Sequence, residues 1–222
     1  MRNGKNILLE KMGKTMRSRS VEWKNNLVKM LGRLEYIKQL PKKQTESNIC
    51  LHVGCGKNIL DGFVNIDKYY DDSRVINCDM YKLPHSPNSV SAIYSSHALE
   101  HLPIRRAKMC IENWYSILAQ EGMLYLAIPD LEEIMHIFLD PNVPDTSKEY
   151  WYMYTLFGYQ ADCSDLENAY RNDIPVDPGQ FHTCGFSKKS ISKLLTDNGF
   201  VIQDIYNYDG YATPSIWVEA KK

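Results

Sequence analysis

The stretch ICLHVGCGKNILDGFVNID, residues 49–67, is the part of the sequence that decides the expected fold. It opens with alternating apolar residues over 49–53, a pattern typical of a short strand. Glycines flank Cys55 directly after this run, and a second short strand is predicted over 63–66. That second strand ends on a carboxylate, Asp67. Neighbouring strands that end on glycines and an acid predict an open α/β sheet with a ligand site at its carboxyl edge.

The chemistry of these strand ends favours a nucleoside as the ligand. Gly54 and Gly56 allow a sharp turn and let a ligand approach where a Cβ would collide. Asp67 can accept hydrogen bonds from the two hydroxyls of a ribose. A dinucleotide-binding fold would need a third glycine and an acid about 20 positions on. Ile59 stands where that glycine should be, and Asp67 follows Gly54 by only 13 positions, so NAD is not expected.

Further segments extend this pattern to a known family. GCG followed by NID, together with SHALEH at 96–101 and the segment from Gln120 to Asp130, resembles the class I S-adenosylmethionine-dependent methyltransferases. The likeness covers about Asn48 to the C-terminus and is to a compact branch with a shortened first crossover. It implies a Rossmann-like α/β fold: a doubly wound, mostly parallel seven-stranded sheet with an antiparallel C-terminal hairpin. It also implies S-adenosylmethionine as the cofactor.

The resemblance assigns a cofactor site residue by residue. Asp79, after a predicted strand over 74–77, matches the acid that accepts from the adenine amino group, and Met80 matches its neighbour that packs on the ring. A turn or helix-capping role is the alternative for Asp79. The residues that the resemblance places at the cofactor are Gly54, Cys55, Gly56, Asp67, Asp79, Met80, Ser96 and His97.

The segment SHALEH supports two chemical interpretations. It is predicted to open a helix after a strand over 91–95, and in the resembled family such a segment passes beside the methionine half of the cofactor. The same letters also contain H-x-x-E-H, a zinc motif that places two histidines on one helical face. We expect no metal, because that motif needs a further ligand and normally stands without an upstream nucleoside site. His97 is expected nearer the ligand, and His101 is expected to be structural, paired with Glu100 or a backbone carbonyl.

The remaining elements complete the expected order of alternating strands and helices. Asp130 is predicted to cap a helix; the alternative is that its side chain faces the acceptor site. Ser187 is predicted to cap the last helix. The other predicted elements are a helix over 107–120 closed by Gly122, a strand over 123–128, and closing strands over 200–206 and 215–220.

Charge divides the chain into a basic arm and an acidic body. Residues 1–43 hold 12 Lys and Arg against 3 acids, a net of +9, whereas the whole chain has a net charge of −1. We therefore divide the chain into an arm over 1–47 and a methyltransferase-like domain over 48–222. An amphipathic helix is predicted from Ser20 to Pro41, followed by a linker. It packs on the domain or on a second copy, or it meets an anionic partner such as a membrane surface or nucleic acid.

An insertion at about 140–186 is expected to cover the acceptor. It contains nine aromatic residues and has a net charge of −6. Such a surface repels phosphate and suits sugar rings or other neutral hydroxylated molecules. The alternative is that 150–159 simply packs as a helix. His182 lies in a predicted loop at the end of this insertion, where a histidine can face a pocket.

These patterns predict methyl transfer to a small hydroxylated acceptor, such as a sugar or glycan precursor (O-methylation). His97 is the first candidate for the general base, because an imidazole titrates near neutral pH, and His182 is the second. The alternatives are a non-catalytic methyltransferase-like interaction module and a nucleic-acid methyltransferase that uses the basic arm. We do not expect nucleic acid, and the oligomeric state stays open.

Composition gives the expected compartment. The six cysteines show no CxxC spacing and are expected to be buried and reduced. No apolar run approaches the about 18 residues of a membrane span, and the N-terminus lacks the apolar core of a signal peptide. We therefore expect a cytoplasmic protein.

Overall fold

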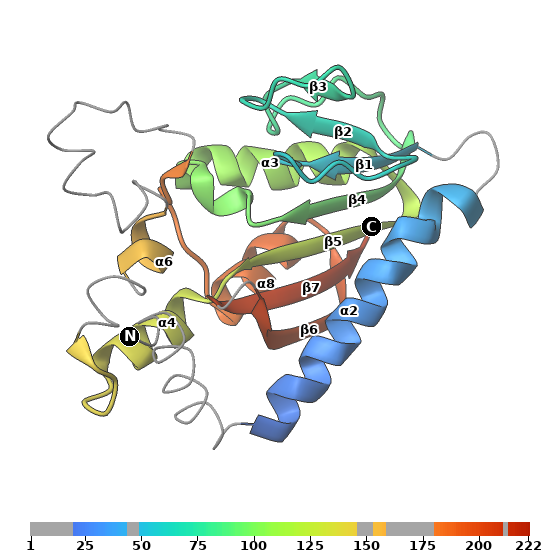
Figure 1. The fold of residues 1–222 in the computed structure, drawn as a ribbon. Coiled ribbons are helices and arrows are strands. Elements are labelled where there is room, and N and C mark those ends of the chain that lie inside the picture. Colours follow the sequence, from blue (N-terminus) through green and yellow to red (C-terminus); the bar gives the residue numbers. More distant parts are fainter. Residues whose placement is uncertain (1–19, 44–48, 146–152, 159–179, 211–212) are drawn as a thin grey trace, which may run out of the picture.

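A seven-stranded mixed sheet forms the centre of the computed structural model, which describes residues 20–43, 49–145, 153–158, 180–210 and 213–222 (Figure 1). Its strand order is β3-β2-β1-β4-β5-β7-β6. The first five strands are parallel, and β7 runs antiparallel to both β5 and β6. The strands are β1 Ile49–Val53, β2 Val64–Asp67, β3 Val75–Asn77, β4 Val90–Ser96, β5 Leu118–Pro129, β6 Val201–Gly210 and β7 Thr213–Lys221. The predicted doubly wound sheet with an antiparallel hairpin is therefore confirmed.

Helices cover both faces of the sheet, as the alternation of buried side chains requires. Along β1, Leu51 belongs to the core shared with α3 (Ile104–Ile117) and α8 (Lys188–Asp197), whereas Cys50 faces the core under α2 (Ser20–Lys43). Trp114 of α3 is fully buried in the first core. The remaining helices are the 3-10 turn η2 Leu99–His101, α4 Leu131–Leu139 and α6 Met153–Phe157. No helix among the described residues combines the length and apolarity needed to cross a membrane.

The helix predicted in the basic arm packs on the domain through both apolar and charged side chains. Ile37 is fully buried against the sheet, and Lys29 forms an ion pair with Asp204 of β6. The Nε of Arg33 lies 3.0 Å from Glu219, a buried carboxylate of β7. Two cations of the arm are therefore used inside the fold. The helix continues to Lys43 rather than ending at the predicted Pro41.

The observed ends of the other elements differ from the predicted ones where strand pairing overrides a local helical propensity. Helix α3 ends at Ile117 rather than at 120, because Leu118 is already extended and begins β5. Gly122 therefore lies inside β5 instead of closing a helix. The predicted caps Asp130 and Ser187 are confirmed: each side chain accepts from backbone N–H groups in the first turn of α4 or α8.

The segment SHALEH is not helical at its start. The N–H of His97 bonds to the carbonyl of Ala127 in β5, at 2.9 Å, and His97 takes a φ of 50°. Only Leu99–His101 forms a single 3-10 turn. His97 and His101 therefore do not share a helical face, which the zinc motif requires. Residues 1–19 and 44–47, and most of the predicted acidic insertion (146–152 and 159–179), lie outside the described residues.

Candidate functional site

A cavity of about 780 Å³ opens at the carboxyl ends of β1, β2 and β4. Its outer wall includes Leu34 and Ile37 of α2, so the N-terminal helix contributes to the site. The cavity is lined by all eight residues that the resemblance placed at the cofactor: Gly54, Cys55, Gly56, Asp67, Asp79, Met80, Ser96 and His97.

The turn after β1 needs both of its glycines, for different reasons. Gly54 has a φ of +69°, and a Cβ there would overlap the side chain of Ala98. Gly56 has a φ of +48° but no atom within 4 Å of an added Cβ, so its open side leaves room for a ligand. The first glycine lets the turn pack, and the second keeps the cavity clear.

Asp67 is fixed in place by the backbone around it. Its Oδ2 accepts from the N–H of Gly56 at 2.9 Å, and its Oδ1 accepts from those of Tyr69 and Tyr70 at 2.8 and 3.0 Å. A carboxylate offers about four acceptor positions. About one position, on Oδ2, is thus left for a ligand, fewer than the two that the sequence suggested.

Asp79 and Met80 line the cavity after β3. Lys68 donates to Oδ1 of Asp79 at 2.7 Å, and this pairing holds the pKa of Asp79 below its ordinary value. The carbonyl of Met80 accepts from the indole N–H of Trp114 at 2.8 Å, which ties the loop to α3. Asp79 is therefore held by a cation at the cavity, and a hydrogen bond from Tyr81 also lowers its pKa.

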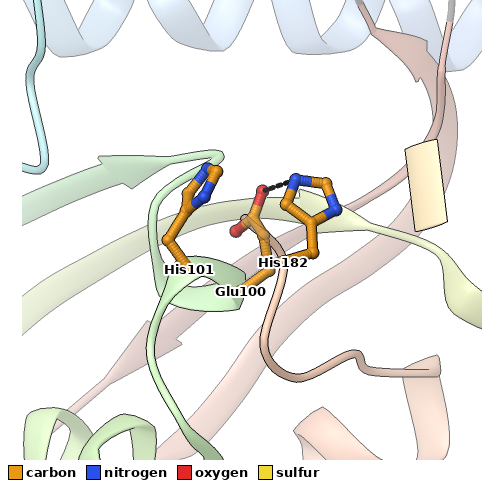
Figure 2. Close-up of side chains that lie close together, drawn as sticks. All are labelled: Glu100, His101 and His182. Carbon is orange, nitrogen blue, oxygen red and sulfur yellow. Dashed lines mark ion pairs between the residues drawn. The ribbon is translucent and has the colours of Figure 1, made fainter. Parts of the chain in front are cut away.

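Glu100 lies between His101 and His182 (Figure 2), and it is close to His97; of these residues, His97 and His101 line the cavity. The residue is 1% exposed, and among the described residues neither of its carboxylate oxygens accepts a hydrogen bond within normal distance. The ring nitrogens nearest to its carboxylate are His97 Nδ1 at 3.5 Å and His182 Nε2 at 3.9 Å. Burial alone would raise the pKa of Glu100, but the facing imidazoles, His97 first, lower it below its ordinary value. The site therefore contains a buried carboxylate charge.

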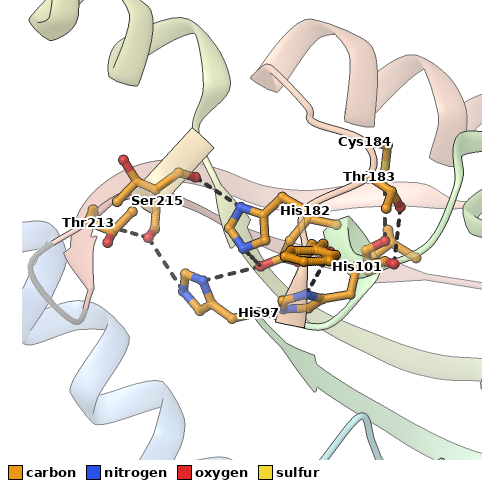
Figure 3. Close-up of polar contacts among 11 residues, drawn as sticks. His97, His101, His182, Thr183, Cys184, Thr213 and Ser215 are labelled. Atoms are coloured by element: carbon orange, nitrogen blue, oxygen red, sulfur yellow. Dashed lines mark hydrogen bonds and ion pairs between the residues drawn. The ribbon is translucent and has the colours of Figure 1, made fainter. Parts of the chain in front are cut away.

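His97 connects this carboxylate to the cavity. Its Nδ1 faces Glu100, and its Nε2 lies 3.5 Å from the hydroxyl of Ser215 in β7 (Figure 3). Its side chain is 22% exposed, so the ring can meet a ligand. A carboxylate near one nitrogen and a serine hydroxyl near the other orient the ring of His97 where it lines the cavity, which is an arrangement compatible with a general base.

The structure separates the two histidines that were predicted to be catalytic. His182 does not line the cavity but lies behind Glu100, with its Nδ1 2.9 Å from the carbonyl of Thr155. Burial lowers the pKa of His182. His101 lines the cavity, and its Nδ1 donates to the carbonyl of Phe181 at 3.1 Å, which is the structural pairing expected of it.

Comparisons with known proteins agree with this architecture. Residues 64–126 match the family model described as "Methyltransferase domain". A SAM-dependent methyltransferase from Methanosarcina mazei has a TM-score of 0.57 at 12% identity, over 82% of this chain and 95% of that chain. The structure of a complex between the Haloferax volcanii Trm112 methyltransferase activator and a methyltransferase gives a TM-score of 0.51 at 12% identity, over 95% of this chain and 92% of that chain. A search of curated proteins finds no match.

Residues 64–126 of this chain are similar to a methyltransferase domain, and its sheet has the fold of the solved methyltransferase from Methanosarcina mazei. This likeness supports an enzyme of methyl transfer with S-adenosylmethionine as its cofactor.

The cavity of this methyltransferase fits that cofactor. Gly56 leaves open space beside the turn, Asp67 has an acceptor position left at the end of β2, and Asp79 also lines the cavity. These features suit the ribose and adenine of a nucleoside.

Two residues of the methyltransferase site were missed as functional residues by the sequence. Glu100 was considered only as a partner of His101, although it is the only acidic residue in the segment SHALEH and lies between the two histidines in the sequence. Ser215 lies in an apolar strand and gave no signal, because its neighbour His97 is 118 positions away.

Proposed function

We propose that this methyltransferase methylates a hydroxyl group of a small, neutral acceptor, such as a sugar or glycan precursor. The observation that supports this most is the position of His97 on the same cavity as Gly56 and Asp67, backed by buried Glu100. A nucleoside site and an oriented base therefore open onto one space. S-adenosylmethionine supplies a methyl group on a sulfonium, which is already an activated leaving group.

The nucleoside end of the cavity would position the cofactor. The remaining acceptor position of Asp67 would take a ribose hydroxyl, and the carboxylate of Asp79 would take the adenine amino group. Met80 would pack on the ring, while Gly54, Cys55, Ser96 and His97 would line the methionine end. Holding the two reactants in line, with water excluded, provides most of the rate in a displacement of this kind.

His97 would take the proton of the acceptor hydroxyl at Nε2. Its Nδ1–H would point at Glu100, so the carboxylate would keep the correct tautomer and stabilise the imidazolium that forms. A general base of this kind contributes roughly 10²–10⁴-fold. We assign the base to His97 rather than to His182, because only His97 lines the cavity.

A nucleic-acid acceptor receives less support. Lys29 and Arg33 of the basic arm are paired with Asp204 and Glu219 inside the fold. An acidic segment also precedes His182 in the sequence, and it would repel a phosphate backbone. The non-catalytic alternative is disfavoured by the buried charge of Glu100, which a binding module would have no reason to keep.

Calorimetric titration with S-adenosylmethionine and S-adenosylhomocysteine tests the first part of the proposal. We expect micromolar binding of both, weakened at least 10-fold by Asp67→Ala and unchanged by His136→Ala, which removes an exposed histidine of α4. Release of S-adenosylhomocysteine in the presence of a panel of sugars and sugar nucleotides then tests the acceptor. Turnover with RNA but with no sugar would overturn the acceptor class, and absence of nucleoside binding would overturn the whole proposal.

A further inference from the structure

Three side chains with metal-binding chemistry meet next to the cavity, which His101 lines. Glu100 and His101 come from the turn η2, and His182 comes from the segment that leads to α8 (Figure 2). A carboxylate oxygen of Glu100 and one ring nitrogen of each histidine all lie within 4.8 Å of one another. The two segments are 81 positions apart in the sequence, so the fold alone creates the cluster.

Backbone carbonyls fix the tautomers of both histidines. Nδ1 of His182 lies 2.9 Å from the carbonyl of Thr155, and Nδ1 of His101 lies 3.1 Å from the carbonyl of Phe181. Because a carbonyl only accepts, each Nδ1 carries a proton, and in the neutral ring each Nε2 keeps its lone pair. Metal-binding histidines are oriented in the same way, by donating their other ring N–H to a carbonyl or carboxylate.

The charge of Glu100 calls for a cation at this point. The carboxylate is buried, and among the described residues no donor satisfies either of its oxygens. It faces the lone pair of His182 Nε2 at 3.9 Å, so two acceptors point at each other. A buried carboxylate whose oxygens accept no hydrogen bond is costly, and a metal ion between these atoms would offset that cost.

We propose that Glu100, His101 and His182 form a binding site for a divalent transition metal of the zinc class. Two imidazole nitrogens and one carboxylate oxygen are a common zinc set, with bonds of about 2.0–2.2 Å and a fourth position left open. Such bonds place the donors roughly 3.4 Å apart, so small side-chain rotations would close the cluster around the ion. Because His101 lines the cavity, the fourth position would be reached from there.

This ligand set differs from the one that the H-x-x-E-H letters suggest. That motif would use both His97 and His101 from one helix, whereas His97 lies outside the turn η2 and is left as the candidate base. His182 takes the place of the further ligand that the sequence did not identify. The inference departs from our expectation of no metal, and it does not rest on the proposed acceptor.

Calorimetry of the chelator-treated full-length protein with zinc chloride tests the site. We expect one ion per chain with micromolar or tighter affinity. Glu100→Gln and His182→Ala should each weaken binding at least 100-fold, while His136→Ala, which removes an exposed histidine, should leave it unchanged. Circular dichroism melts of each variant establish that it is folded.

Cobalt titration keeps the test independent of the variants. Tetrahedral cobalt bound by two nitrogens and an oxygen should give intense visible bands in the wild-type protein. Weak octahedral bands, zinc affinity no tighter than millimolar, or unchanged binding in folded His182→Ala would each overturn the site and leave a proton-linked cluster. Asp67→Ala should lose the nucleoside but keep the metal, so failure of the metal site and failure of the proposed function are distinguishable.

Discussion

The two ends of the cavity are built by different means. The nucleoside end is formed by strand termini and backbone groups. Three backbone N–H groups donate to Asp67, and glycines allow the tight turn after β1. At the histidine end, side chains from distant segments surround Glu100, and its charge is buried without a hydrogen bond from the described residues. The first end is local and satisfied, and the second is non-local and electrostatically costly. Buried charges with this electrostatic cost are typical of catalytic sites.

The largest effect should come from the histidine end. His97→Ala should lower kcat by about 10²–10⁴-fold, because the acceptor proton loses its base. The affinity for S-adenosylhomocysteine should fall far less than kcat, because the contacts at the nucleoside end stay and only the lining of the methionine end changes. Measurement of kcat and of cofactor affinity on the same preparations checks this, with His136→Ala as the control. Full activity of a folded His97→Ala protein would exclude His97 as the base.

The nucleoside end should respond through backbone geometry. Gly54→Ala should lower the free energy of unfolding by about 4 kcal/mol, because a left-handed φ and an overlap with Ala98 act together. Gly56→Ala meets no protein atom and should cost only about 1–2 kcal/mol while it weakens nucleoside binding. Urea unfolding and calorimetry of both variants test this.

A double variant separates the two causes at Gly54. Gly54→Ala with Ala98→Gly removes the overlap but keeps the unfavourable φ, so it should recover roughly half of the lost stability. No recovery would mean that backbone strain alone explains the effect.

A histidine near the nucleoside end offers a contrast in pH dependence. His52 in β1 is 3% exposed and lines the cavity, and burial lowers its pKa from 6.5 to about 4. Above pH 6.5 the ring is neutral in both states. Between pH 6.5 and 4 only the unfolded chain gains the proton, so the free energy of unfolding falls by about 3 kcal/mol as the pH decreases.

Substitution of this histidine should flatten the acid side of the stability profile. Urea unfolding of His52→Gln near pH 7 and near pH 4 should show a loss about 3 kcal/mol smaller than that of the wild type. His136→Gln, at an exposed position, should behave as the wild type. An identical loss in wild type and His52→Gln would show that the ring is protonated in the folded state.

The same contrast explains what the sequence could and could not predict. The strand ends, the glycine turn and Asp67 follow from local patterns, and the resemblance adds Asp79 and Met80; the structure brings these residues to one cavity. The role of Glu100 could not be predicted, because its surroundings depend on His182 and on the pairing of His97 with β5. The helix expected at SHALEH failed for the same reason, since tertiary pairing overrode a local helical preference.

The smallest effect should come from the exposed charge at the nucleoside end, which sharpens the contrast with buried Glu100. Lys68 and Asp79 form an ion pair at 2.7 Å, but their side chains are 41% and 30% exposed. Water screens such a pair, so Lys68→Ala should lower the free energy of unfolding by 1 kcal/mol or less. About 1 M sodium chloride should erase the difference between variant and wild type. Urea unfolding of both proteins at low and high salt measures this difference.

A loss in the free energy of unfolding above about 2 kcal/mol that persists at high salt would mean that this pair is desolvated like the charge of Glu100. The two ends of the cavity would then share one electrostatic character, and the division between a satisfied binding end and a costly chemical end would fail.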